Sequence, residues 1–248
     1  MSNRQNGANT SGHDVDELLK RITKLENLLS QQSAPETSNA NIYFLLDRSG
    51  SMQSIEEYVV QGFDEFIVEQ RKEAGEATFT LVQFDGDDPD DVVIDAKPLS
   101  LITSIAGRFV PRGMTPLYDA IGLLLDRAER RLTRTGADPA DQLVVIMTDG
   151  MENASRECTP DGIFERIAEL RKAGWTFVFL GANQDSYATG STLGVVAGNT
   201  SNYTASPDSV LAAQRGLSRA VTSWRAKPRH TRLADAEDFW EGVKEGEE

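Results

Sequence analysis

The chain has 248 residues, with 25 basic and 39 acidic side chains, and therefore a net charge of −14. So acidic a chain repels phosphate backbones, which excludes generic binding to DNA or RNA unless a dense basic patch exists locally. Cys158 is the single cysteine, and His13 and His230 are the two histidines, which excludes an intrachain disulfide framework and argues against a zinc site. The length fits one domain of ordinary size with additional segments.

No membrane or secretion signal is visible. No apolar run approaches the ~18 residues of a membrane helix, and the N-terminus lacks the apolar core of a secretory signal. We therefore expect a cytoplasmic protein without a membrane span.

Three segments precede the predicted main domain. Residues 1–13 are rich in Asn, Ser, Gly and Thr and are predicted to be disordered. Residues 14–31 predict a helix with a seam of about two heptads, formed by Val15, Leu18, Ile22, Leu25 and Leu29. This helix fits either a short coiled coil that joins copies of the chain into a homo-oligomer or an amphipathic helix that docks on its own domain. Residues 32–40 are predicted to be a linker, which favours the coiled coil.

From residue 41 onward, short apolar runs alternate with longer segments of helical periodicity. Strands are predicted at residues 42–46, 78–84, 92–96, 143–147 and 175–180. Helices are predicted at residues 55–74, 116–132, 162–173 and 209–224. This alternation predicts an α/β domain over residues 41–225, with a doubly wound, mostly parallel sheet and helices on both faces. The short connection between the second and third strands predicts one antiparallel edge strand.

Residues 226–248 form a charged C-terminal segment. It is basic as far as Arg232 and acidic from Asp235, and it also contains Phe239 and Trp240. We interpret it as a solvated tail. The alternatives are a peptide that anchors a partner through the two aromatic residues, or a flap over the domain's own surface.

Three loops beside predicted strand or helix ends carry oxygen donors. Asp47, Ser49 and Ser51 follow the first strand, Thr115 precedes the helix at 116–132, and Asp149 follows the strand at 143–147. Ligands of open α/β sheets bind beyond the carboxyl ends of the strands, so these ends are the place to look for a site. Hydroxyl and carboxylate oxygens without a thiol or imidazole favour a hard cation such as Mg²⁺.

At these residues the chain resembles the von Willebrand factor A (vWA) domain family and its metal-ion-dependent adhesion site (MIDAS). Asp47, Ser49 and Ser51 match the first loop of that site, Thr115 the second and Asp149 the third; Met114 departs from the small residue common in the second loop. The resemblance implies a Rossmann-like vWA fold and a site for Mg²⁺ or Mn²⁺. It also implies that a partner protein supplies an Asp or Glu to the metal, and the chain is similar to intracellular microbial and phage-borne adaptors of this family.

We therefore expect a Mg²⁺-dependent protein-binding module, either an adaptor or an assembly subunit, and not an enzyme. One alternative is a structural or oligomeric subunit with a vestigial metal site. The other is a metal-dependent phosphotransfer or hydrolase enzyme that uses Asp47. Against the enzyme, the sequence shows neither a P-loop pattern nor a nucleophile–base pair.

Several neighbours of the loops are candidates for tuning the site. Arg48 and Arg112 are expected either to attract an acidic ligand or to be solvated. Asp119, one helical turn after Thr115, is expected either to hold a metal-bound water or to be an exposed acid. The turn at residues 181–185 is a candidate specificity rim.

Two further features carry no predicted role. An acidic cluster is expected to be a solvated hairpin tip rather than a Ca²⁺ loop, because the full twelve-residue pattern is absent; its members are Asp85, Asp87, Asp88, Asp90 and Asp91. Cys158 has no base beside it in the sequence and is expected to be inert.

Overall fold

The computed structural model describes residues 20–21, 39–182 and 186–240. The chain divides into two units, Met1–Glu36 and Thr37–Glu248. Of the first unit only Lys20 and Arg21 are described, and both are exposed helical residues. The disorder predicted for residues 1–13, most of the helix at 14–31 and most of the linker therefore lie outside the described residues, and the coiled coil stays a prediction.

The second unit is built on a six-stranded sheet with the order β3-β2-β1-β4-β5-β6. Four of its five strand pairs are parallel, and β3 runs antiparallel to β2 at one edge. The strands are β1 (Ala40–Asp47), β2 (Ala77–Phe84), β3 (Asp91–Pro98), β4 (Gln142–Thr148), β5 (Thr176–Ala182) and β6 (Thr200–Tyr203). The doubly wound α/β fold and its antiparallel edge strand are thus confirmed.

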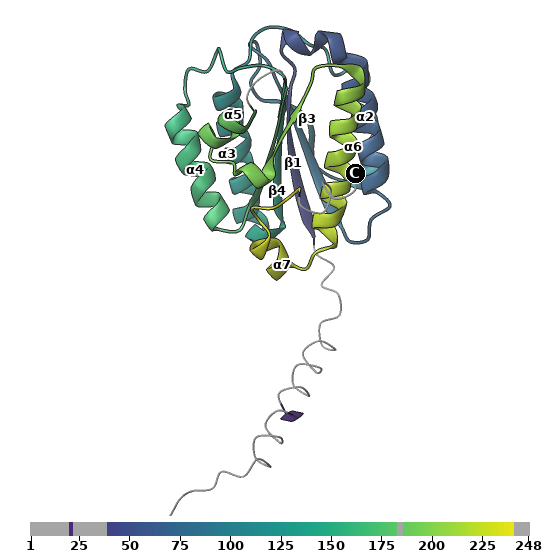
Figure 1. Cartoon of the computed structure of the whole chain (residues 1–248), viewed down its shortest axis with the longest axis vertical. Helices are drawn as coiled ribbons and strands as arrows, with labels where there is room; N and C mark the ends of the chain where they lie inside the picture. Colours follow the sequence, from purple (N-terminus) through teal and green to yellow (C-terminus); the bar gives the residue numbers. More distant parts are fainter. Residues whose placement is uncertain (1–19, 22–38, 183–185, 241–248) are drawn as a thin grey trace, which may run out of the picture. The chain divides into compact units, whose positions relative to one another are not determined.

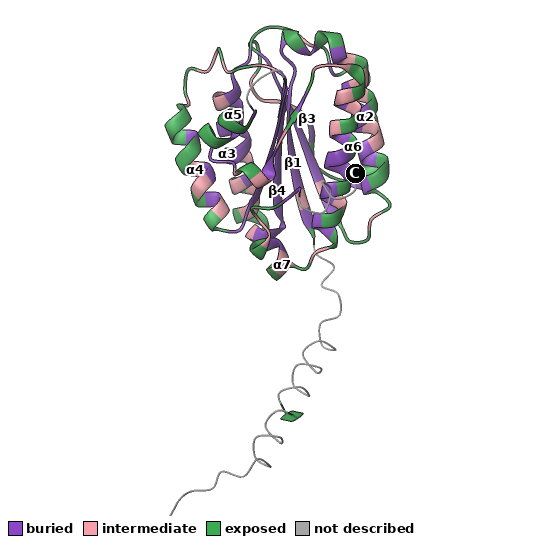
Figure 2. Ribbon diagram, viewed as in Figure 1, coloured by how far each residue is buried: buried purple, intermediate pink, exposed green. Residues whose placement is uncertain are grey.

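Helices cover both faces of this sheet (Figure 1). On one face lie α2 (Glu56–Gln70) and α6 (Pro207–Ala226). On the other lie α3 (Leu117–Thr135), α4 (Pro160–Lys172) and α5 (Ser186–Thr192). Because both faces are covered, all seven residues of β4 and all seven of β5 are buried, as Figure 2 shows for the centre of the sheet.

The sixth strand was not predicted. β6 is four residues long and reads Thr-Ser-Asn-Tyr, with no apolar run. It forms at the edge of the sheet because its backbone pairs with β5, from Phe179 opposite Thr200 to Ala182 opposite Tyr203. The short helix α5, which precedes it, was also missed because it lies within a polar stretch.

The C-terminal segment packs on the second unit as far as Trp240. A short helix, α7 (Arg229–Ala234), follows α6, and Phe239 and Trp240 are both buried. The backbone N–H of Trp240 donates to the carbonyl of Gly198 at 3.3 Å. For residues 227–240 the interpretation as a solvated tail is therefore wrong, and the flap over the domain's own surface is observed; residues 241–248 lie outside the described part.

Among the described residues, no helix combines the length and the apolar character that crossing a membrane requires.

Candidate metal centre

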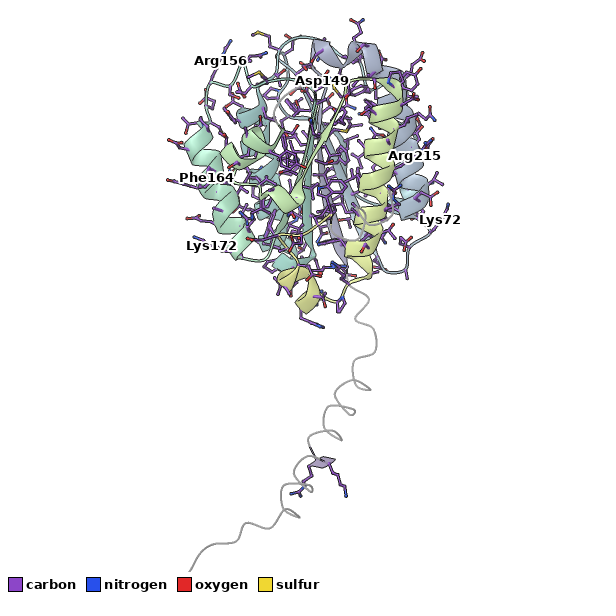
Figure 3. All side chains as sticks on the ribbon, in the orientation of Figure 1. Lys72, Asp149, Arg156, Phe164, Lys172 and Arg215 are labelled. Carbon is purple, nitrogen blue, oxygen red and sulfur yellow. The ribbon has the colours of Figure 1, made fainter. Side chains whose placement is uncertain are left out.

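The three predicted loops meet at the edge of the sheet where the parallel strands end, here called the carboxyl edge. Asp47 is the last residue of β1, and Asp149 directly follows β4. These strands are neighbours in register, with Leu46 opposite Met147, so their ends lie side by side. Asp149 is labelled at this edge in Figure 3.

Hydrogen bonds fix both carboxylate oxygens of Asp47, which is fully buried. Its Oδ1 accepts the backbone N–H of Ser49 at 2.7 Å, and its Oδ2 accepts the hydroxyl of Thr148 at 2.5 Å. The Thr148 hydroxyl in turn accepts the N–H of Gly150 at 3.1 Å. The start of the first loop is thereby tied to the start of the third.

Two serine hydroxyls connect the first loop directly to Asp149. Ser51 lies in the short 3-10 helix η1 (Gly50–Ile55) that follows β1. Its hydroxyl donates to Asp149 Oδ1 at 2.6 Å, and Ser49 Oγ lies 3.0 Å from Ser51 Oγ. The side-chain oxygens of Ser49, Ser51 and Asp149, which come from two loops, are thus linked by consecutive hydrogen bonds.

Thr115 joins the set from the loop before α3. A Cβ added to Gly150 would lie 2.8 Å from Thr115 Oγ1 and 3.5 Å from Asp47 Oδ2, so both oxygens border the same small space, and only glycine leaves it open. The backbone of Thr115 is held by Asn153, whose Oδ1 accepts its N–H at 2.8 Å and whose N–H donates to its carbonyl at 3.1 Å.

The electrostatics of this cluster are unfavourable without a cation. Burial raises the pKa of Asp47 to about 6; hydrogen bonds from Thr148 and Ser49 oppose this shift, and the charge of Asp149 adds to it. Burial also raises the pKa of Asp149. Two carboxylates that resist ionisation, surrounded by hydroxyl oxygens, are a donor set that fits a hard divalent cation. The described residues hold no group of three or more His, Cys, Asp or Glu side chains suited to a metal, so a cation at this site would need hydroxyl or water oxygens as further ligands.

A profile of the von Willebrand factor type A domain family matches residues 41–213. The chain belongs to the von Willebrand factor type A domain family. A search of curated proteins found no match.

Solved structures share the vWA fold at low sequence identity. Proximal thread matrix protein 1 from the mussel byssus is 19% identical with a TM-score of 0.51, and the match covers 75% of this chain and 46% of that one. The SpRpn10 VWA domain is 13% identical with a TM-score of 0.50, covering 72% and 94%. The pilus adhesin SpaC from Lactobacillus rhamnosus GG is 13% identical with a TM-score of 0.55, covering 75% and 30%. The chain thus spans less than half the length of the mussel protein, and at such identities the likeness shows the fold alone.

Another structure of the mussel protein is described as having a zinc-occupied MIDAS motif; it is 18% identical to this chain, with a TM-score of 0.50 over 75% of this chain and 46% of that one.

Arg48 of the vWA domain is not solvated. It is buried, and its guanidinium pairs with Asp85 at 2.6 Å and with Asp91 at 2.5 Å. The expectation that Arg48 is solvated is therefore wrong, because Asp85 in the β2–β3 connection and Asp91 at the start of β3 pair with it in the interior. Arg112 is half exposed and also pairs with Asp85, at 3.0 Å.

The acidic connection between β2 and β3 is not simply a solvated tip. Asp85 is fully buried. Burial by itself would raise its pKa, but hydrogen bonds from the N–H groups of Asp87 and Asp88 and from Arg48 outweigh burial and lower the pKa. Asp85 therefore anchors the loop as a charged residue, whereas Asp87 and Asp88 remain exposed.

Asp119 caps a loop and is therefore not the free surface acid that was one of the two expectations; a contact with a metal-bound water stays a prediction. Its carboxylate accepts three backbone N–H groups, from Arg156 at 2.7 Å, Glu157 at 3.0 Å and Cys158 at 2.7 Å. Burial raises the pKa of Cys158, and the negative charge of Asp119 raises it further. This keeps the thiol protonated, in keeping with the inert role expected for it.

Thr148, Asn153 and Tyr203 support the site, although no role was predicted for them from the sequence. Tyr203, on β6, donates its hydroxyl to the Thr148 carbonyl at 3.2 Å; burial, followed by the charges of Asp149 and Asp47, raises its pKa well above the usual value. Thr148 and Asn153 flank Asp149 within five residues, so their proximity to a predicted ligand was the available signal. No such signal existed for Tyr203. Within the turn at 181–185, residues 183–185 lie outside the described part of the chain, so the specificity rim proposed there stays a prediction.

Proposed function

We propose that this vWA domain binds Mg²⁺, or Mn²⁺ in its place, and uses the bound ion to capture a carboxylate of a partner protein. The residues that would hold the ion are Asp47, Ser49, Ser51, Thr115 and Asp149. The observation that carries the proposal is the pair of buried carboxylates with raised pKa values beside converging hydroxyls. When bound, the cation supplies a positive charge with an open coordination position.

The chain's own residues position these oxygens before any ligand arrives. The Ser49 N–H and the Thr148 hydroxyl hold the carboxylate of Asp47 in one orientation. Asn153 holds the backbone of Thr115. Because these hydrogen bonds already hold Asp47 and Thr115 in place, little conformational entropy would be lost when the two residues coordinate an ion.

The surroundings of the site support a protein partner rather than a small molecule. Met114 precedes Thr115 and is 53% exposed, and Met151 follows the Asp149–Gly150 turn and is 72% exposed. Exposed methionines beside a polar centre are typical of adaptable protein-binding surfaces. A partner would place its acidic side chain at the ion and would pack apolar side chains against Met114 and Met151.

We also propose that the protein is an adaptor or assembly subunit of the cytoplasm and has no catalytic activity. Among the described residues, the single histidine is His230, on α7, and it is not among the residues at the carboxyl edge. Within the described part of the chain, Asp47 therefore has no imidazole to act as its general base. Metal-dependent turnover of nitrophenyl phosphate by the purified chain would contradict this part of the proposal.

Co-purification in Mg²⁺ and in EDTA tests the main proposal. We expect a partner protein to be retained in Mg²⁺ and lost in EDTA, and the Asp149→Ala variant to lose it in both conditions. Glu165→Ala is the matched control, because Glu165 is an exposed acid on α4. Equal retention in EDTA and in Mg²⁺ by the folded wild type would show that capture does not depend on the metal. It would favour the alternative of a structural or oligomeric subunit with a vestigial site.

A further inference from the structure

A groove of about 940 Å³ runs along α2 and α6, on the sheet face they cover. Figure 1 shows the two helices side by side. Its residues lie on these helices or, for Glu73, in the turn after α2, and none is in the loops of the carboxyl edge, so the groove is separate from the candidate metal centre.

The groove is strongly acidic on its α2 side. Two arginines line the groove, Arg215 and Arg219, and the carboxylates that line it outnumber them. These carboxylates belong to Glu57, Asp64, Glu65, Glu69 and Glu73. Arg215, labelled beside α6 in Figure 3, is engaged by Glu65 at 2.9 Å. The carboxylates of Glu57 and Asp64, both on α2, have no hydrogen bond or ion pair with any described residue. They are seven residues apart and therefore share one side of α2.

The groove also has apolar side chains in its wall and contains one unsatisfied acceptor. Val60 and Val68 line it, and Val68 is 50% exposed. Gln214 lines it from α6 with only 4% of its surface exposed, and its Oε1 has no hydrogen-bond partner within the described structure. This oxygen lies against Gly62, where an added Cβ would meet it at 1.6 Å. A buried acceptor without a donor is unusual in a folded protein, and Gln214 is a residue of the groove wall that carries one.

We propose that this groove binds a basic amphipathic helix of a partner protein. Such a helix would lay apolar residues at i, i+3, i+4 and i+7 against Val60 and Val68. Its lysines or arginines would pair with Glu57 and Asp64, and one of its donors would reach Gln214. The charge of the groove selects a basic occupant over a second copy of this acidic chain.

A fluorescein-labelled peptide of about fourteen residues, with leucines at helical spacing and lysines elsewhere, is a suitable probe. We expect the full-length protein to bind it by fluorescence anisotropy, equally in Mg²⁺ and in EDTA. The double variant Glu57→Lys/Asp64→Lys should bind about tenfold more weakly. Val68→Ser should weaken binding about threefold without a change in charge. Amide hydrogen exchange should slow in α2 and α6 when the peptide is added.

The matched control is Glu165→Lys/Glu169→Lys, two exposed acids of α4 on the other face of the sheet. It makes the same change in net charge, so it separates the groove from the general attraction of an acidic chain for a basic peptide. Equal loss in the two double variants, or protection outside α2 and α6, would overturn the proposal. So would tight binding of a peptide in which glutamates replace the lysines. Because binding is expected in EDTA, failure of this proposal is distinguishable from failure of the metal-dependent function.

Discussion

The hydroxyl of Ser51 donates a 2.6 Å hydrogen bond to Oδ1 of Asp149, across 98 residues of chain. It joins the loop after β1 to the loop after β4, and both of its oxygens are proposed metal ligands. The two loops are thus held at a fixed spacing by the same groups that would share an ion. This preorganisation lowers the entropic cost of binding a cation.

Asp149→Asn should weaken cation binding strongly while leaving the fold intact. The new amide keeps an oxygen that accepts the Ser51 hydroxyl, but the negative charge is lost. Since changes in residues behind a metal ligand already cost 10–100-fold, we expect loss of a direct carboxylate to cost about 100-fold or more. Calorimetric titration with MgCl₂ or MnCl₂ measures this, with Glu165→Gln as the control. Unchanged affinity would remove Asp149 from the ligand set.

Asp47 should make the metal-free domain less stable at neutral pH than at acid pH. Burial raises its pKa from 3.8 to about 6 in the folded chain. Below pH 3.8 the carboxyl is protonated in both the folded and the unfolded chain, and above about pH 6 it is ionised in both. Stability is therefore lost as the pH rises between these values. The loss is about 3 kcal/mol, at about 1.4 kcal/mol per pKa unit.

Asp47→Asn is expected to remove this loss. In EDTA at about pH 7.5 the variant should unfold at a higher temperature than the wild type, and near pH 4 the two should be almost equal. The Thr148 hydroxyl can adapt, because it can donate to the Gly150 carbonyl at 3.1 Å and accept from the new amide. Mg²⁺ should stabilise the wild type only. A lower unfolding temperature of the variant in EDTA at neutral pH would show that the buried charge is not costly.

Arg48→Met should destabilise the domain without a direct effect on cation binding. The substitution leaves Asp85 buried with only the half-exposed Arg112 as a cationic partner. Breaking one side of a buried ion pair costs about 3–5 kcal/mol, and the remaining contact to Arg112 places the expected value near 3. Urea unfolding measures the loss. Arg156→Met, at an exposed arginine labelled in Figure 3, is the control and should change stability little. Unchanged stability together with weaker capture of an acidic partner would restore the role in ligand attraction.

Trp240→Ala should lower the free energy of unfolding by about 3 kcal/mol, a typical cost for truncating a buried aromatic residue. Trp240 is buried and packs edge-on against Phe239, with ring centres 5.3 Å apart. Leu101→Ala, at a residue 66% exposed, is the control. Thermal unfolding of the two variants would settle whether the C-terminal segment belongs to the cooperative unit; equal, small effects would show that it does not.

The residues of the candidate site could be predicted from the sequence. Asp47, Ser49, Ser51, Thr115 and Asp149 were all named from the order of three loops, and the structure brings all five together. The reason is topological: adjacent parallel strands end at the same edge of a sheet, so residues that follow β1 and β4 must lie close together. Whether the set binds a metal remains the prediction that the titrations above address.

The order of the main strands and helices, and the oxygen-bearing residues of the candidate site, follow from local sequence patterns, because hydrophobic periodicity and turn residues act over a few positions. In contrast, whether a charged or aromatic residue is buried, and which residue it contacts, depends on long-range packing. The ion pair of Arg48 with Asp85 spans 37 residues of chain, and the burial of Phe239 and Trp240 depends on a loop near Asn199. Both features depend on contacts between segments that are far apart in the sequence, and those contacts exist only once the chain has folded.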